Sequence, residues 1–140
     1  MSKAGTLDAS PTLGAAAFRL PGRMTLAGAP EGADARWLAN ALADPEMPPV
    51  LAIAVDEEKA LRLLHGVAFF VPKLDALFLP AWDCLPYDRS SPNAEILSQR
   101  IDTLARLAAN PPRLLVTTVN AALQRVPPKS FFENARYTAR

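Results

Sequence analysis

Residues 50–55, Val-Leu-Ala-Ile-Ala-Val, are the stretch of the chain that decides its fold. Every position in this run is apolar, so it lacks the alternation that a strand with one solvent-facing side would show. Val and Ile are also residues that strands favour. The run therefore predicts a β-strand covered on both faces, which is typical of a parallel sheet between layers of helices.

Strand and helix patterns alternate on both sides of this run. Further strands are predicted at residues 24–28, 77–79 and 113–118. Helical spacing of apolar residues predicts helices at 34–43, from Asp56 onward, from Ser91 through Ala108, and at 119–125. Strands that alternate with helices form parallel sheets through crossover connections. We therefore expect an α/β three-layer sandwich of P-loop or flavodoxin-like type, with a mostly parallel sheet.

The helix after Ser91 has the clearest pattern in the chain. Ser91 is a capping residue, and Pro92 suits the first helical position. Apolar residues then recur at intervals of three and four, at Leu97, Ile101, Leu104 and Ala108. Such a stripe predicts the buried face of the helix.

Composition and charge exclude several classes of protein. The chain has 140 residues, of which 50% are apolar, and its formal net charge is +1. A near-neutral chain has no overall field for nucleic acid or an anionic membrane, and no apolar run approaches the ~18 residues that cross a bilayer. One cysteine, Cys84, and one histidine, His65, form neither an internal disulfide nor a structural zinc site. We expect a cytoplasmic protein without a metal and without a membrane partner.

The loop after the first predicted strand lies where a phosphate-binding loop would lie. Such a loop reads G-x-x-x-x-G-K-[ST], because backbone N–H groups and a lysine must converge on the phosphates. Counted from Gly28, the second glycine and the lysine are replaced by Ala33 and Asp34, although Gly32 lies next to them. An aspartate there would repel phosphate. The loop is predicted not to bind a nucleotide, and the chain is predicted to lack a functional Walker A motif.

The segment from residue 80 to 92 holds the other candidate residues. Cys84 with His65 would be a nucleophile and its base, although a packed cysteine and a helix-terminal histidine are the commoner arrangement. Asp83 and Asp88 would be a metal or acid–base pair, or turn and cap residues beside proline. The side chains of Trp82, Tyr87 and Arg89 would stack on bases, dock a partner, or fold the loop back onto the sheet.

Two stretches together carry a family resemblance. Residues 79–100 read Leu-Pro-Ala-Trp-Asp-Cys-Leu-Pro-Tyr-Asp-Arg-Ser-Ser-Pro-Asn-Ala-Glu-Ile-Leu-Ser-Gln-Arg, and residues 115–128 read Leu-Val-Thr-Thr-Val-Asn-Ala-Ala-Leu-Gln-Arg-Val-Pro-Pro. The patterns W-x-x-L-P-Y-D-x-x-S-P and V-N-x-x-x-Q-R-V within them are specific in combination. Residues 24–134 resemble the N-terminal region of bacterial transcription-repair coupling factors (Mfd).

The resemblance implies a fold and a set of partners. It implies a degenerate RecA-like domain, similar to the excision-repair protein UvrB, that is interrupted by a small UvrA-binding domain. It also implies a motor farther along the full-length protein, which uses ATP and Mg to move on double-stranded DNA and acts on stalled RNA polymerase. No ATP-site, DNA-contact, polymerase-contact or UvrA-contact residue is implied within this chain.

The expected organisation has three parts. Residues 1–20 are predicted to be a flexible N-terminal arm, 21–128 the first half of the degenerate RecA-like domain, and 129–140 the truncated start of the UvrA-binding insert. The chain is expected to be a non-catalytic, cofactor-free scaffold for that insert. Two alternatives remain. One is a UvrB-type module that binds damaged DNA, although the chain lacks the long hairpin of UvrB; the other is a small cytosolic α/β enzyme that uses Cys84.

Overall fold

The structure is a computed structural model that describes residues 6–7, 18, 21–84 and 93–134. The chain divides into two compact units. The first unit contains Met1–Pro48 and Arg62–Leu74, and the second contains Pro49–Leu61 and Asp75–Arg140. The long helix α3 (Glu57–Phe70) begins in the second unit and ends in the first.

The first unit holds a two-stranded parallel sheet, helix α2 and most of α3. Strand β1 (Thr6–Leu7) pairs with β2 (Thr25–Leu26), and helix α2 spans Ala33–Leu42. The helix predicted at 34–43 is confirmed, and so is its buried side, formed by Trp37, Leu38, Ala41 and Leu42. The prediction that the strand at 24–28 belongs to the main sheet is wrong. Its two paired residues, β2, find their described partner in β1 instead.

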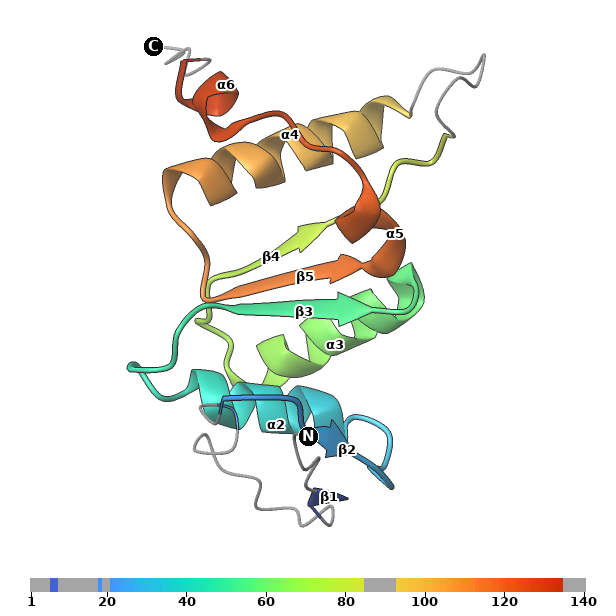
Figure 1. The fold of residues 1–140 in the computed structure, drawn as a ribbon, viewed down its shortest axis with the longest axis vertical. Coiled ribbons are helices and arrows are strands. Elements are labelled where there is room, and N and C mark those ends of the chain that lie inside the picture. Colours follow the sequence, from blue (N-terminus) through green and yellow to red (C-terminus); the bar gives the residue numbers. More distant parts are fainter. Residues whose placement is uncertain (1–5, 8–17, 19–20, 85–92, 135–140) are drawn as a thin grey trace. The chain divides into compact units, whose positions relative to one another are not determined.

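The second unit is built on a parallel sheet of three strands. Strands β3 (Val50–Ala54), β5 (Leu114–Thr118) and β4 (Ala76–Leu79) lie in the order β3-β5-β4 (Figure 1). Val50 and Ala76 both pair with Leu114, so the three strands start at the same level. Leu114 and Val116 of the central strand are fully buried. The α/β class and the parallel sheet are confirmed, whereas the three-layer, RecA-like arrangement stays a prediction.

The strand that decides the fold is not covered on both faces. Leu51 and Ile53 are 55% and 53% exposed, whereas Ala52 and Ala54, which point to the other face, are half-buried. The expectation of burial on both sides is therefore wrong for this chain. An apolar sequence indicates that a strand favours a buried environment, but other elements must supply the side chains that bury it.

Helix α4 (Ala94–Ala109) buries a face other than the predicted one. Arg100 and Thr103 are its buried residues, and the predicted stripe is only partly covered, with Leu97 and Ile101 exposed. Two side-chain hydrogen bonds explain the difference. Thr103 Oγ1 donates to the carbonyl of Phe78 at 2.9 Å, and Arg100 Nη1 donates to the carbonyl of Pro80. Buried polar groups with partners are tolerated against the sheet, so periodicity of apolar residues alone misassigned the face.

The ends of the other helices agree with the sequence in part. Asp56 caps α3 as expected, because its carboxylate accepts from the Lys59 N–H at 2.8 Å. Helix α4 begins at Ala94 with Asn93 as its N-cap residue, and the predicted cap, Ser91, lies outside the described residues. Helix α5 (Val119–Leu123) is confirmed near its predicted position, and α6 (Lys129–Asn134) follows it. Within the described part of the chain, no helix is both long and apolar enough to span a membrane.

Candidate functional site

The first candidate site lies at the carboxyl end of β4. In open α/β sheets, ligands bind outside the carboxyl ends of the strands. The segment after Leu79 carries Trp82, Asp83 and Cys84, three of the residues that the sequence singled out. We call the set Trp82, Asp83, Asn93, Arg100 and Gln124 the Trp82 cluster; all five residues belong to the second unit.

Arg100 is the centre of the Trp82 cluster. Its side chain is 1% exposed, and the guanidinium carbon lies 4.6 Å from the centre of the Trp82 ring. Nη1 donates to the Pro80 carbonyl, while Nε has no acceptor among the described residues. Burial lowers the pKa of the Arg100 guanidinium from its usual value, because desolvation penalises the charged form. An arginine stays protonated in proteins, so this side chain supplies a fixed cation and not an acid or base.

The rest of the Trp82 cluster joins the two ends of the segment that follows β4. The Trp82 N–H donates to Gln124 Oε1 at 2.9 Å. The Asp83 carboxylate accepts from the Asn93 N–H, at 3.1 Å to Oδ2 and 3.3 Å to Oδ1. Asn93 Oδ1 in turn accepts from the Glu95 N–H at 2.9 Å, which caps α4. These polar groups are thus hydrogen-bonded to one another, and their bonds hold residue 83 next to residue 93.

The strand ends beside the Trp82 cluster are also closed by internal bonds. Thr117 Oγ1 donates to the Leu79 carbonyl at 2.9 Å, and Thr117 is buried. Thr118 Oγ1 accepts from the Ala121 N–H at 3.2 Å and so caps α5. Where a ligand of an α/β enzyme would meet backbone and hydroxyl groups, these groups already have partners within the chain. The hydrogen bonds among the described residues can hold the segment after β4 in place.

The loop at 28–34 was the second sequence candidate, and it belongs to the first unit. Gly32 takes a left-handed conformation with φ of 79° at the start of α2 and makes no side-chain cap. Two carboxylates lie here: Asp34 in the first turn and Glu31 just before it. Asp34 Oδ1 accepts from the Ala35 N–H at 2.8 Å. Helix N-termini attract anions, and these carboxylates already place negative charge where a phosphate would approach.

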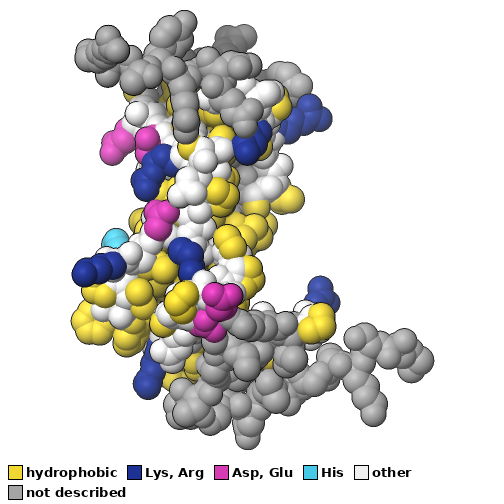
Figure 2. Space-filling view, turned by 90° about the vertical axis from the view of Figure 1, so that its left-hand side faces the viewer, with side chains coloured by type: hydrophobic (Ala, Val, Ile, Leu, Met, Phe, Trp, Pro, Cys, Tyr) yellow, Lys and Arg dark blue, Asp and Glu magenta, His cyan; other side chains and the backbone are white. Residues whose placement is uncertain are grey.

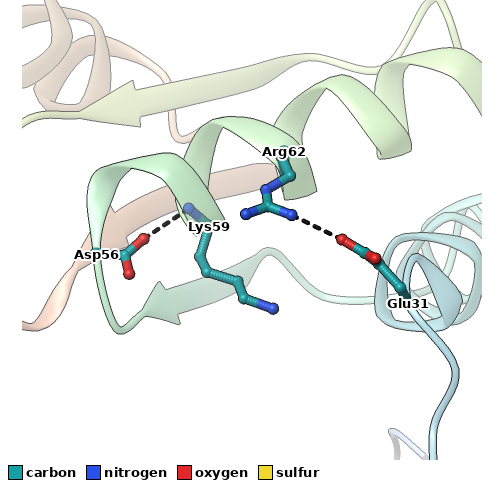
Figure 3. Close-up of polar contacts among 4 residues, drawn as sticks. All are labelled: Glu31, Asp56, Lys59 and Arg62. Carbon is teal, nitrogen blue, oxygen red and sulfur yellow. Dashed lines mark hydrogen bonds and ion pairs between the residues drawn. The ribbon is translucent and has the colours of Figure 1, made fainter.

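Glu31 also forms an ion pair with α3. Glu31 Oε1 lies 2.7 Å from Arg62 Nη1, as the close-up shows together with the Asp56 cap (Figure 3). Both side chains are exposed, so the pair contributes little to stability, on the order of 0–1 kcal/mol. It nevertheless gives Glu31 a structural role.

The Cys84–His65 pair stays a prediction, because its two residues belong to different units. Cys84 is half-buried in the second unit, whereas His65 is exposed on the part of α3 that belongs to the first. Tyr87, Asp88 and Arg89 lie outside the described residues, so the Asp83–Asp88 pair and the stacking surface stay predictions. Among the described residues, no three His, Cys, Asp or Glu side chains are grouped so that they could hold a metal ion.

Three members of the Trp82 cluster were missed by the sequence analysis. Asn93 carried a signal, because asparagine is a preferred N-cap and follows a proline here. Arg100 lies outside the apolar stripe that was predicted to be the buried face of its helix, and nothing in the pattern around Gln124 indicated a contact with Trp82. On the face that Figure 2 shows, cationic and anionic side chains are interspersed with hydrophobic ones, without a continuous basic surface among the coloured residues.

The comparisons with known proteins agree on one kind of relative. A transcription-repair coupling factor of Escherichia coli is 36% identical over 110 residues, which are 79% of this chain and 10% of the relative. One from Rickettsia bellii is 40% identical over 81 residues, which are 57% of this chain and 7% of the relative. The chain therefore spans a tenth or less of the length of these relatives. No family model matches it.

Proposed function

Because this chain is homologous to one segment of the transcription-repair coupling factors, we propose that it supplies a non-catalytic scaffold within such a factor. In this proposal the chain frames a domain that recruits UvrA. Other regions of the full-length protein bind RNA polymerase and double-stranded DNA and use ATP with Mg. Its contribution to coupling repair to transcription is then to hold neighbouring parts in place.

One observation carries the scaffold role. The carboxyl edge of the sheet is closed at β4 by the chain's own side chains, because Arg100, Thr117 and Gln124 bond to the backbone of Pro80, Leu79 and Trp82. A binding site needs unpaired groups that converge on an open position. A set of internal bonds at this edge favours rigidity of the segment between β4 and α4 over binding of a substrate.

The loop at 28–34 supports the same proposal. A nucleotide site needs cationic side chains and free N–H groups at the helix start. Here the helix start carries Asp34, and Glu31 is paired with Arg62. We propose that the loop has kept the turn of a nucleotide-binding fold and serves the contact between α2 and α3.

The proposal is tested with a hybrid protein. The segment of the E. coli factor that this chain matches is replaced by the corresponding residues of this chain, and the hybrid is expressed in cells that lack their own factor. After ultraviolet irradiation, the repair of the transcribed strand is compared with that of the other strand. We expect the hybrid to restore the preference for the transcribed strand.

Two results would overturn the proposal. One is a hybrid present at the normal cellular level that gives no strand preference, because a scaffold of the right family should fit. The other is ATP turnover by the isolated chain that disappears when Gly28 or Gly32 is changed. A hybrid whose segment carries Arg36→Ala, at an exposed polar position of the first unit, is the matched control and should behave like the unchanged hybrid.

A further inference from the structure

One face of the three-stranded sheet in the second unit carries large apolar side chains that the described residues leave partly exposed. Residues that pair in register in a parallel sheet point to the same face. Leu51 pairs with Leu115, which pairs with Leu77, and Ile53 pairs with Thr117, which pairs with Leu79. These six side chains therefore form one face, which we call the Leu51 face.

Burial changes steadily across the Leu51 face. On β4, Leu77 and Leu79 are buried, and α4 packs along this strand. On the central strand, Leu115 is half-buried and Thr117 is buried, whereas on β3 both Leu51 and Ile53 are more than half exposed. One side of the face is thus covered and the other side is open.

The apolar side chains on both faces of β3 indicate that the strand favours a buried environment on each side. Ala52 and Ala54 point away from the Leu51 face and are half-buried, and small side chains of this kind permit a close approach. The large residues Leu51 and Ile53 point into the open side. A strand that faced solvent on this side would carry polar residues there. This pattern of side chains favours a packing site over a solvated surface on the open side.

The spacing of the strands determines what fits there. β3 and β4 are separated by β5, so their distance is two strand spacings, or about 9.6 Å. Packed helices lie about 8–10 Å apart. A second helix that packed beside a helix over β4 would therefore lie over β3. Asp56 and Glu57 lie two and three residues beyond the end of β3, so such a helix gains from a Lys or Arg near the carboxyl end of that strand.

We propose that the Leu51 face docks an amphipathic α-helix from the part of a transcription-repair coupling factor that lies outside the segment matched by this chain. The relatives extend far beyond that segment, because it makes up 7–10% of their length. This inference rests on the proposed function, since it takes the rest of the factor as the source of the helix. It adds the surface, the class of element and the side chains that bind it.

The test compares thiol accessibility in the isolated chain and in the hybrid factor described above. Ile53→Cys is introduced in a Cys84→Ser background, and maleimide labelling at position 53 is followed by site-resolved mass spectrometry. The matched control is Val126→Cys, because Val126 is 50% exposed and lies outside the sheet. We expect position 53 to react at least about tenfold more slowly in the hybrid than in the isolated chain, and position 126 to react equally fast in both.

A photo-crosslinking residue at position 51 then identifies the docked element. We expect crosslinks to residues of the E. coli part at intervals of three and four, as in one face of a helix. Equal labelling of position 53 in the isolated chain and in the hybrid overturns the proposal. Protection of position 53 in the isolated chain that rises with its concentration also overturns it, because the occupant is then a second copy.

Crosslinks at alternate residues overturn the helix assignment, because they indicate a strand. These outcomes are separate from the repair assay. A hybrid that restores strand-selective repair while position 53 stays reactive refutes the docking surface alone. A hybrid with a protected position 53 and no strand preference refutes the proposed function alone.

Discussion

Gly66 is the residue whose substitution tests the packing of the first unit most sharply. It lies inside α3, and a Cβ added to it would lie 2.6 Å from the Cβ of Ala35 on α2. Carbon atoms pack at about 3.5–4.0 Å, so Gly66→Ala must push the two helices apart by about 1 Å. Overpacking of this kind costs about 1–3 kcal/mol, whereas replacing a helical glycine by alanine gains about 0.8–1.0 kcal/mol. We expect Gly66→Ala to lower the free energy of unfolding by about 1 kcal/mol.

Urea denaturation followed by circular dichroism measures this change, and two variants provide the controls. Ala68→Gly, at an exposed position of the same helix, calibrates the propensity term and should cost about 1 kcal/mol. Ala35→Gly combined with Gly66→Ala moves the methyl group from one helix to the other. The double variant should be at least about 1 kcal/mol more stable than the sum of the single changes predicts. If Gly66→Ala raises the stability, or if the changes are additive, the helices do not meet at Gly66.

Three further changes test the second unit by the same denaturation measurement. Arg100→Met should lower the free energy of unfolding by about 1–2 kcal/mol, because the Pro80 carbonyl loses its donor. Arg100→Ala should lower it by about 2–5 kcal/mol, because this change also opens a cavity. Equal losses for the two variants would refute the burial of the side chain. Asn93→Ala removes the N-cap of α4 and should cost about 0.5–2 kcal/mol, and an unchanged midpoint would refute the cap. Leu104→Ala should cost less than the ~2–5 kcal/mol of a fully buried leucine, because Leu104 is only half-buried; a full loss would restore the apolar stripe as the packed face.

The sequence predicted the elements of this fold better than their surroundings. The helix at 34–43, the cap at Asp56 and the strands at 50–55 and 113–118 follow from local patterns, which contacts along the chain enforce. The pairing of β2 with β1 did not follow, because two-residue strands leave almost no periodicity to read. The cover of a strand is supplied by distant residues, so an apolar run could not reveal that Leu51 and Ile53 are open.

The sequence predicted where the candidate site lies but not all of the residues that form it. Trp82 and Asp83 attracted attention as an aromatic and a carboxylate in a proline-bounded loop, and both belong to the Trp82 cluster. Arg100 was missed because arginine is rarely buried, and only a carbonyl and an aromatic ring at the end of β4 make its burial tolerable here. Sequence patterns indicate the environment that a side chain favours. Which residues form a cluster depends on the partners that the fold brings together.

The Trp82 cluster and the Leu51 face point to the same role from opposite properties. At the carboxyl edge of β4, the backbone groups of Leu79, Pro80 and Trp82 are paired with side chains of the same chain. On β3, by contrast, apolar groups that should be paired are open. Covering the exposed side chains of Leu51 and Ile53 with protein would gain free energy by removing apolar surface from water. Under the proposed function, Leu51 and Ile53 are covered only in the full-length factor. Labelling of the Ile53→Cys variant therefore tests the docking proposal more directly than an assay of turnover does.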